Sequence, residues 1–140
     1  MGRDRLNFLW PLALSAIVAL PAAGAAQVSA TAASSRHDTP ATVLKTALRS
    51  VTASQARYRQ ANGAFAADLN QLDVRPDPTV RVEILAAGAV GWQAKAVHSA
   101  QLGRSCVIFV GKLDGVDAPR TDADREMAGE EGVPLCDRMR

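Results

Sequence analysis

The longest regular pattern of apolar residues in this chain lies between residues 39 and 62. Apolar side chains recur there at steps of three and four, which predicts one helix with a single apolar stripe, made of Val43, Leu44, Ala47, Leu48, Val51, Gln55 and Tyr58. Thr39 is a suitable N-cap, and Pro40 fits the first turn, where no amide hydrogen is needed. Asn62-Gly63 is a typical helix end.

A short helical turn is predicted after this helix. Phe65, Leu69 and Leu72 are spaced so that they share one side of such a turn. The proline-rich run from Arg75 to Pro78 then ends it.

From residue 79 onward, the spacing of apolar residues changes to every second position. Alternating or apolar runs separated by short turns predict three strands, at 79–86, 92–99 and 105–111. The third is apolar almost throughout, which is typical of a strand covered on both faces. Consecutive strands with short connections favour an antiparallel meander, and the helix would cover one face of it. We therefore expect an α+β fold with a three- to four-stranded sheet.

The N-terminal 26 residues have the three regions of a secretory signal peptide. A charged start precedes 13 apolar residues and then a run of small residues. Thirteen helical residues rise only about 20 Å, against a hydrocarbon core of about 30 Å, so we expect cleavage and no stable membrane span. An uncleaved anchor is the alternative. We expect residues 27–38 to be a flexible linker, residues 39–137 the globular domain and residues 138–140 a tail, in the periplasm or outside the cell.

Composition narrows the function classes. The chain has 140 residues, a net charge of +2, two cysteines and two histidines. A chain of this length is too short for a multidomain enzyme, and its net charge is too small for a nucleic-acid binder. It also has too few cysteines and histidines for a structural zinc site. No paired carboxylates, phosphate loop or catalytic triad stand out, so we expect no enzyme activity and no organic cofactor.

Cys106 and Cys136 are the two cysteines. An exported chain meets oxidising conditions, so a disulfide is the first interpretation. It would close a loop of about 31 residues and hold the irregular segment 112–137 to the third strand. The alternatives are a metal-binding pair and a catalytic thiol, in which Cys106 would act with His98.

Charge is divided between two segments. The predicted helix carries only basic charges on its polar face: Lys45, Arg49, Arg57 and Arg59. This face is predicted to dock an acidic partner or a lipid headgroup, and a merely solvated face is the alternative.

Segment 114–131 is acidic, and clustered carboxylates are what calcium requires. Its candidate calcium ligands are Asp117, Asp122 and Asp124, and a solvated acidic loop is the alternative.

The order of these parts resembles type IV pilins and the pseudopilins of type II secretion. The resemblance rests on YRQANGAFAADLNQL, residues 58–72, on the strands that start near Trp92 and Cys106, and on the C-terminal cysteine. It covers residues 40–136. It implies a long helix on an antiparallel sheet with a disulfide-closed C-terminal loop. The family's apolar N-terminal segment with its glutamate has no counterpart here.

The expected function follows from this resemblance and from the missing catalytic motifs. We expect a non-enzymatic, pilin-like module with a protein partner in an envelope or secretion assembly. The alternative is an exported calcium- or small-ligand-binding protein that uses loop 114–131. The sequence decides neither the identity of the partner nor the oligomeric state.

Overall fold

The computed structural model describes residues 38–139. The predicted signal peptide and all but the last residue of the predicted linker lie outside the described residues. The helix α1 (Pro40–Asn62) comes first, followed by the short 3₁₀ helix η1 (Leu69–Gln71). The strands are β1 (Val80–Ala87), β2 (Gly91–His98), β3 (Ser105–Gly111) and β4 (Leu135–Cys136).

Both ends of α1 lie where the sequence predicts them. The Thr39 hydroxyl accepts a hydrogen bond from the Thr42 amide at 3.3 Å, and Pro40 occupies the first turn. Gly63 ends the helix with a left-handed φ of 78°, and its amide donates to the Arg59 carbonyl at 2.8 Å. The predicted helix is confirmed.

The four strands form one antiparallel sheet in the order β1-β2-β3-β4. The three predicted strands agree with β1, β2 and β3 to within one residue at each end. The fourth strand has only two residues, because the chain returns to β3 after a long irregular excursion. A bulge between Ile84 and Ala86 leaves Leu85 outside the register of β1 with β2.

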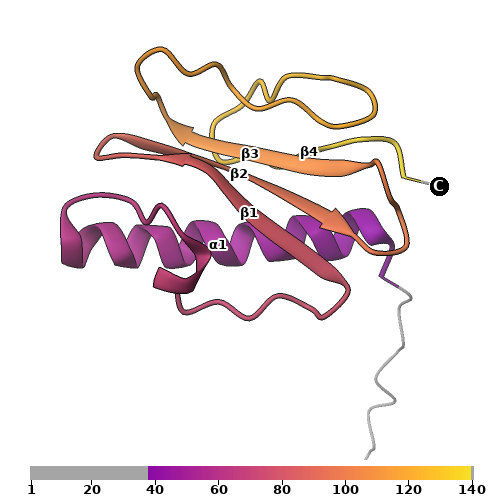
Figure 1. Cartoon of the computed structure of the whole chain (residues 1–140), viewed down its shortest axis with the longest axis horizontal. Helices are drawn as coiled ribbons and strands as arrows, with labels where there is room; N and C mark the ends of the chain where they lie inside the picture. The colour runs from indigo at the N-terminus through magenta and orange to yellow at the C-terminus, as the bar shows by residue number, and fades with distance from the viewer. Residues whose placement is uncertain (1–37, 140) are drawn as a thin grey trace, which may run out of the picture. The chain divides into compact units, whose positions relative to one another are not determined.

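The sheet separates two layers, as Figure 1 shows: α1 covers one face, and the C-terminal segment, residues 112–134, runs over the other. Side chains of a strand alternate between the two faces. In β2, Trp92, Ala94 and Ala96 belong to the core that α1 covers. On the opposite face, Gln93 is also buried, and its Nε2 donates to the Asp117 carbonyl at 2.7 Å.

The third strand is covered on both faces, as predicted. Cys106 and Ile108 belong to the core beneath α1, whereas Ser105 and Val107 point the other way and are fully buried as well. This double burial explains why β3 has no polar alternation in its sequence.

The helical turn after α1 is shorter than predicted. Only Leu69–Gln71 is helical, and Phe65 lies in a non-helical stretch before it. The Phe65 amide donates to the Gly88 carbonyl at 3.0 Å, which ties this stretch to the β1–β2 turn. Phe65 and Leu72 are nevertheless buried in the core, as their spacing suggested.

Gln55 is a polar residue within the apolar stripe of α1, and the structure explains its place there. Its side chain is fully buried. The amide group donates to the Ala66 carbonyl and accepts from the Ala66 amide, both at 2.8 Å. Ala66 is itself 1% exposed, so water does not reach these two backbone groups. One side chain therefore replaces a missing pair of backbone hydrogen bonds.

We expect Gln55→Leu to destabilise the fold by about 2–4 kcal/mol, because it leaves two buried backbone groups unpaired while it keeps an apolar side chain of similar size. Urea unfolding followed by circular dichroism measures this loss. Gln60→Leu, at an exposed position of the same helix, is the matched control and should change stability by less than about 0.5 kcal/mol. Equal effects of the two substitutions would contradict the role of Gln55.

Candidate functional site

The predicted disulfide is present between Cys106 and Cys136. The two residues face each other directly across β3 and β4, with Cα atoms 4.0 Å apart. Cys106 is fully buried on the core side of the sheet. Neither cysteine is free, so the alternative of a catalytic thiol paired with His98 is wrong, and so is the alternative of a metal-binding cysteine pair.

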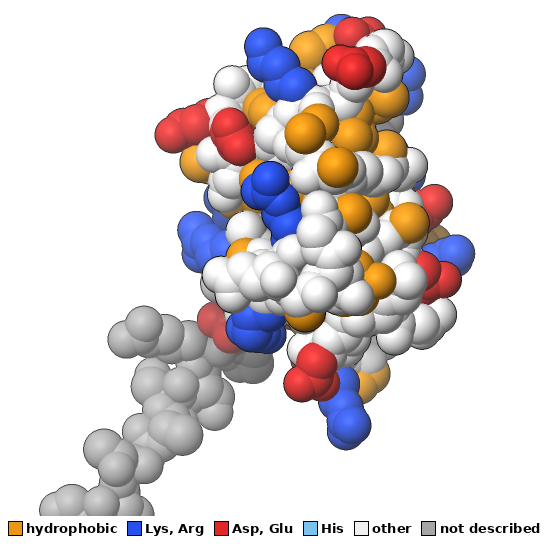
Figure 2. Space-filling view, turned by 90° about the vertical axis from the view of Figure 1, so that its left-hand side faces the viewer, with side chains coloured by type: hydrophobic (Ala, Val, Ile, Leu, Met, Phe, Trp, Pro, Cys, Tyr) orange, Lys and Arg blue, Asp and Glu red, His pale blue; other side chains and the backbone are white. Residues whose placement is uncertain are grey.

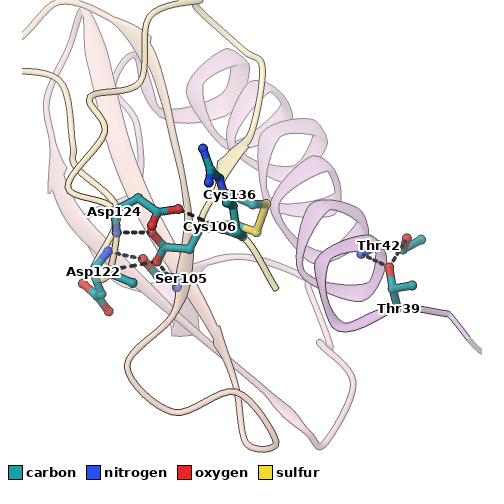
Figure 3. Close-up of a disulfide and its surroundings, with 10 residues drawn as sticks. Thr39, Thr42, Ser105, Cys106, Asp122, Asp124 and Cys136 are labelled. Atoms are coloured by element: carbon teal, nitrogen blue, oxygen red, sulfur yellow. Dashed lines mark hydrogen bonds between the residues drawn. A yellow bond between two sulfur atoms is a disulfide. The ribbon is translucent and has the colours of Figure 1, made fainter. Parts of the chain in front are cut away.

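Asp137, the residue after the disulfide, organises the C-terminal segment. It is 3% exposed, and its carboxylate accepts three backbone amide hydrogen bonds. These come from Ser105 at 2.7 Å, Asp124 at 2.7 Å and Ala123 at 3.1 Å. Figure 3 shows how Ser105, Asp122 and Asp124 gather beside the cystine. A single carboxylate thus joins β3, the irregular loop and the end of the chain.

Hydrogen bonding decides the ionisation of Asp137. Burial raises the pKa of its carboxyl, but the amide hydrogen bonds from Asp124, Ser105 and Ala123, with one from the Thr121 hydroxyl, together outweigh burial. The pKa therefore lies below the ordinary value of 3.8. Asp137 is therefore a carboxylate at neutral pH, and its hydrogen bonds favour that charged form.

The three candidate calcium ligands have other partners. Asp122 forms an ion pair with Lys95 at 3.3 Å, and Asp124 accepts a hydrogen bond from the Arg138 amide at 3.0 Å. Asp117 is exposed and offers its backbone carbonyl to Gln93. Within residues 38–139, no three acidic, histidine or cysteine side chains are grouped in a way that would hold a metal ion. Calcium binding by this loop stays a prediction.

The basic residues of α1 differ in their surroundings. Arg49 and Arg57 are exposed, whereas Lys45 is half-buried. Arg59 lies over the Phe65 ring, with its guanidinium carbon 4.9 Å from the ring centre, so it also packs against the fold. The one ion pair of the described residues joins Lys95 to Asp122, so none of these four residues pairs with a described carboxylate. Their role in binding a partner stays a prediction.

The acidic segment does not neutralise the basic face of α1. It runs over the opposite face of the sheet, with Asp117 and Asp122 placed there by their contacts to Gln93 and Lys95. Within the molecule, the sheet therefore separates the two charged segments.

His98 belongs to a small polar network at the start of β1. Its Nε2 lies 3.1 Å from the Thr79 hydroxyl, and its Nδ1 accepts from the Ala100 amide at 3.0 Å. Thr79 donates to the Asp77 carboxylate through its hydroxyl and its amide, which holds the pKa of Asp77 below its ordinary value. The network fixes two neighbouring turns, and both ring nitrogens of His98 are engaged.

Sequence reasoning missed the role of Asp137. The signal that could have found it is its position: a disulfide between Cys106 and Cys136 forces the neighbouring residues Ser105 and Asp137 together. An acid placed by a covalent bond beside a buried strand must find donors there. The amides that serve it come from a loop whose path no sequence pattern indicates.

Hydrophobic side chains are also exposed at the end of the molecule where α1 stops. Figure 2 shows this end, with apolar side chains gathered between basic and acidic ones. A groove there is lined by Ala56, Arg59, Phe65, Trp92 and Val110, among others.

The described fold agrees with the resemblance noted from the sequence. A helix on a four-stranded antiparallel sheet, with a disulfide near the C-terminus, is consistent with a pilin-like fold. The disulfide favours an oxidising compartment outside the cytoplasm. Among residues 38–139, no helix has both the length and the apolarity that crossing a membrane requires. No protein-family model matches the chain, and no curated protein matches its sequence.

Proposed function

We propose that this chain is a non-enzymatic, exported interaction module of the cell envelope, which docks an acidic protein partner through the outer face of α1. A secretion or pilus-related assembly is the setting that the pilin-like architecture favours. The observation that carries the proposal is the one-signed charge of α1, which contains four basic residues and no acid.

The surroundings of α1 support this role. Arg49 and Arg57 project from the helix face that points away from the sheet, about 80° apart around the axis and about 12 Å apart along it. Charges of one sign on a rigid element steer an oppositely charged partner and orient it. The acidic segment 112–134 lies beyond the sheet, and within residues 38–139 Arg49 and Arg57 are exposed to another molecule.

A chemical step is not part of the proposal. The only two cysteines are joined, and both ring nitrogens of His98 are used in the turn network. These are structural roles, and the proposal rests on surface contacts of the described residues.

Capture of envelope proteins by the immobilised chain tests the proposal. We expect Arg49→Glu/Arg57→Glu to lose at least about tenfold of the captured partner at low salt, because two attractive contacts become repulsive. Lys112→Glu/Arg138→Glu makes the same change in net charge at exposed positions outside α1 and should retain capture. Melting temperatures near that of the wild type confirm that both variants fold.

Two outcomes would overturn the proposal. One is equal loss of capture by the two double variants, which would indicate net charge rather than a docking face. The other is salt-sensitive binding to anionic lipid vesicles, abolished by Arg49→Glu/Arg57→Glu, with no protein captured. In that case the basic face would serve a lipid surface.

A further inference from the structure

We propose that the outer edge of β1 pairs with β1 of a second copy, so that two sheets join antiparallel about Val82. This inference does not depend on the docking role of α1, because it uses a different surface. β1 is the strand at the free end of the sheet order, and Figure 1 shows it as the outermost strand. At the other end, β3 is closed by β4 and by the Gly132 amide, which donates to the Phe109 carbonyl.

The register of β1 shows which backbone groups face outward. Ser99 donates to the Thr79 carbonyl at 2.9 Å, so Thr79 belongs to a hydrogen-bonded pair with Ser99. Such pairs alternate along an antiparallel ladder, so Arg81 and Glu83 also bond toward β2. The amides and carbonyls of Val82 and Ile84 therefore point away from the sheet. No hydrogen bond to these outward groups is found in the described part of the chain.

Two features limit the free edge to five residues. At its start, the Val80 amide donates to the Asp77 carbonyl at 2.8 Å and is already used. At its end, the bulge at Leu85 breaks the regular ladder. A hollow beside the edge is lined by residues 67–70 and by Val82, Glu83 and Ile84, so this hollow separates part of the edge from the segment around η1.

Charge selects a second copy of the same strand as the occupant. Within residues 80–84, β1 can pair with β1 of a second copy in three antiparallel registers, centred on residue 81, 82 or 83, if residues whose backbone groups point outward lie opposite each other. Centring on residue 81 or on residue 83 would place like charges directly opposite each other, which destabilises a strand pair. Centring on Val82 places Arg81 of each copy opposite Glu83 of the other. Both side chains are exposed, and neither forms an ion pair with a described residue.

The same register continues the apolar face. Val80 would lie opposite Ile84 of the second copy, and Val82 opposite its own counterpart. All three side chains belong to the core beneath α1 or pack against it. The pair is two-fold symmetric and closed, so association stops at a dimer. Because only five residues pair, the interface lies at the small end of the range, and the dimer forms only at high concentration.

Sedimentation velocity over a concentration series tests the proposal on protein expressed from the full sequence. We expect a monomer–dimer equilibrium in which Arg81→Glu weakens dimerisation by about tenfold, because two opposite-charge pairs become like-charge pairs. Arg81→Glu/Glu83→Arg reverses both charges and restores opposite pairs, so it should return the dimer to near wild-type strength. Arg49→Glu, on the exposed face of α1, is the control and should leave dimerisation unchanged.

Cross-linking tests the register itself. Arg81 and Glu83 would face each other at a non-hydrogen-bonded position, where side chains approach closely enough for a disulfide. A mixture of Arg81→Cys and Glu83→Cys proteins should therefore cross-link under mild oxidation several-fold more than either protein alone. A monomer at every concentration, or a dimer that Arg49→Glu abolishes and Arg81→Glu does not, would overturn the proposal. The proposal would also be overturned if Arg81→Cys protein alone cross-linked as much as the mixture.

Discussion

Replacing both cysteines in the variant Cys106→Ala/Cys136→Ala should lower the free energy of unfolding by about 3–4 kcal/mol at 25 °C. The sulfurs join residues separated by 30 positions, and in the chain-entropy model a loop of that length gives this magnitude. The loss is large for a domain whose whole stability is of the order of 5–15 kcal/mol. The C-terminal segment is affected most, because β4 contributes only two paired residues to hold it.

Urea unfolding of the double variant and of the wild type measures this effect. Wild-type protein incubated with a reductant at the same pH should approach the stability of the variant, and wild-type protein without reductant is the reference. Trypsin provides a local measurement, since Arg120 and Arg125 are exposed in the segment that the cystine holds. We expect faster cleavage there in the variant. A variant within about 0.5 kcal/mol of the wild type, with unchanged cleavage, would contradict the structural role of the bond.

Asp137→Asn should destabilise the protein at neutral pH by about 2–3 kcal/mol. The asparagine keeps the size of the side chain, but its amide group faces backbone amides that donate hydrogen bonds, so at least one buried donor loses its acceptor. Hydrogen bonds to a carboxylate are also stronger than those to a neutral oxygen. The substitution should loosen the loop around Asp124 and the end of the chain together.

The same variant should lose part of its pH dependence. Because the pKa of Asp137 is lower in the folded state than its ordinary value of 3.8, the unfolded chain takes up the proton first as the pH falls. The contribution of Asp137 is therefore fully present above its unfolded pKa and is lost as the pH falls through the folded pKa. Unfolding free energies at pH 6, 4 and 3 should fall less in Asp137→Asn than in the wild type. Asp117→Asn, at an exposed position without a described side-chain partner, should retain the wild-type slope.

How far the sequence predicts this fold differs between its elements. α1 and the first three strands were predictable because their residues repeat with the period of the element they form. Capping by Thr39 and the left-handed Gly63 further defined the helix ends, since both act within a few residues. The spacing of Phe65, Leu69 and Leu72 predicts a longer helical turn than Leu69–Gln71, because it does not show that the Phe65 amide bonds to Gly88, which is distant in sequence.

The candidate sites were less predictable than the fold. The cluster of acids in the sequence offers Asp117, Asp122 and Asp124 as candidate calcium ligands, and this stays a prediction. In the fold, Asp122 pairs with Lys95 and Asp124 accepts a hydrogen bond from the Arg138 amide, contacts that the sequence does not indicate. Clustering along a chain does not bring side chains around one point unless the backbone turns them inward. The basic residues of α1 were easier to place, because helical periodicity already put Arg49 and Arg57 on the polar side.

The sequence alone determined α1, the first three strands and their order, and it favoured a disulfide between the two cysteines. The helix and the strands depend on neighbours along the chain, and the disulfide was the first interpretation because an exported chain meets oxidising conditions. The tertiary structure decided where the buried polar groups find partners. Gln55 bonds to Ala66, and Asp137 bonds to Ser105. The tertiary structure also placed the basic and acidic segments on opposite faces of the sheet. These contacts join residues far apart in the chain, and only the packing of layers brings such residues within hydrogen-bond distance.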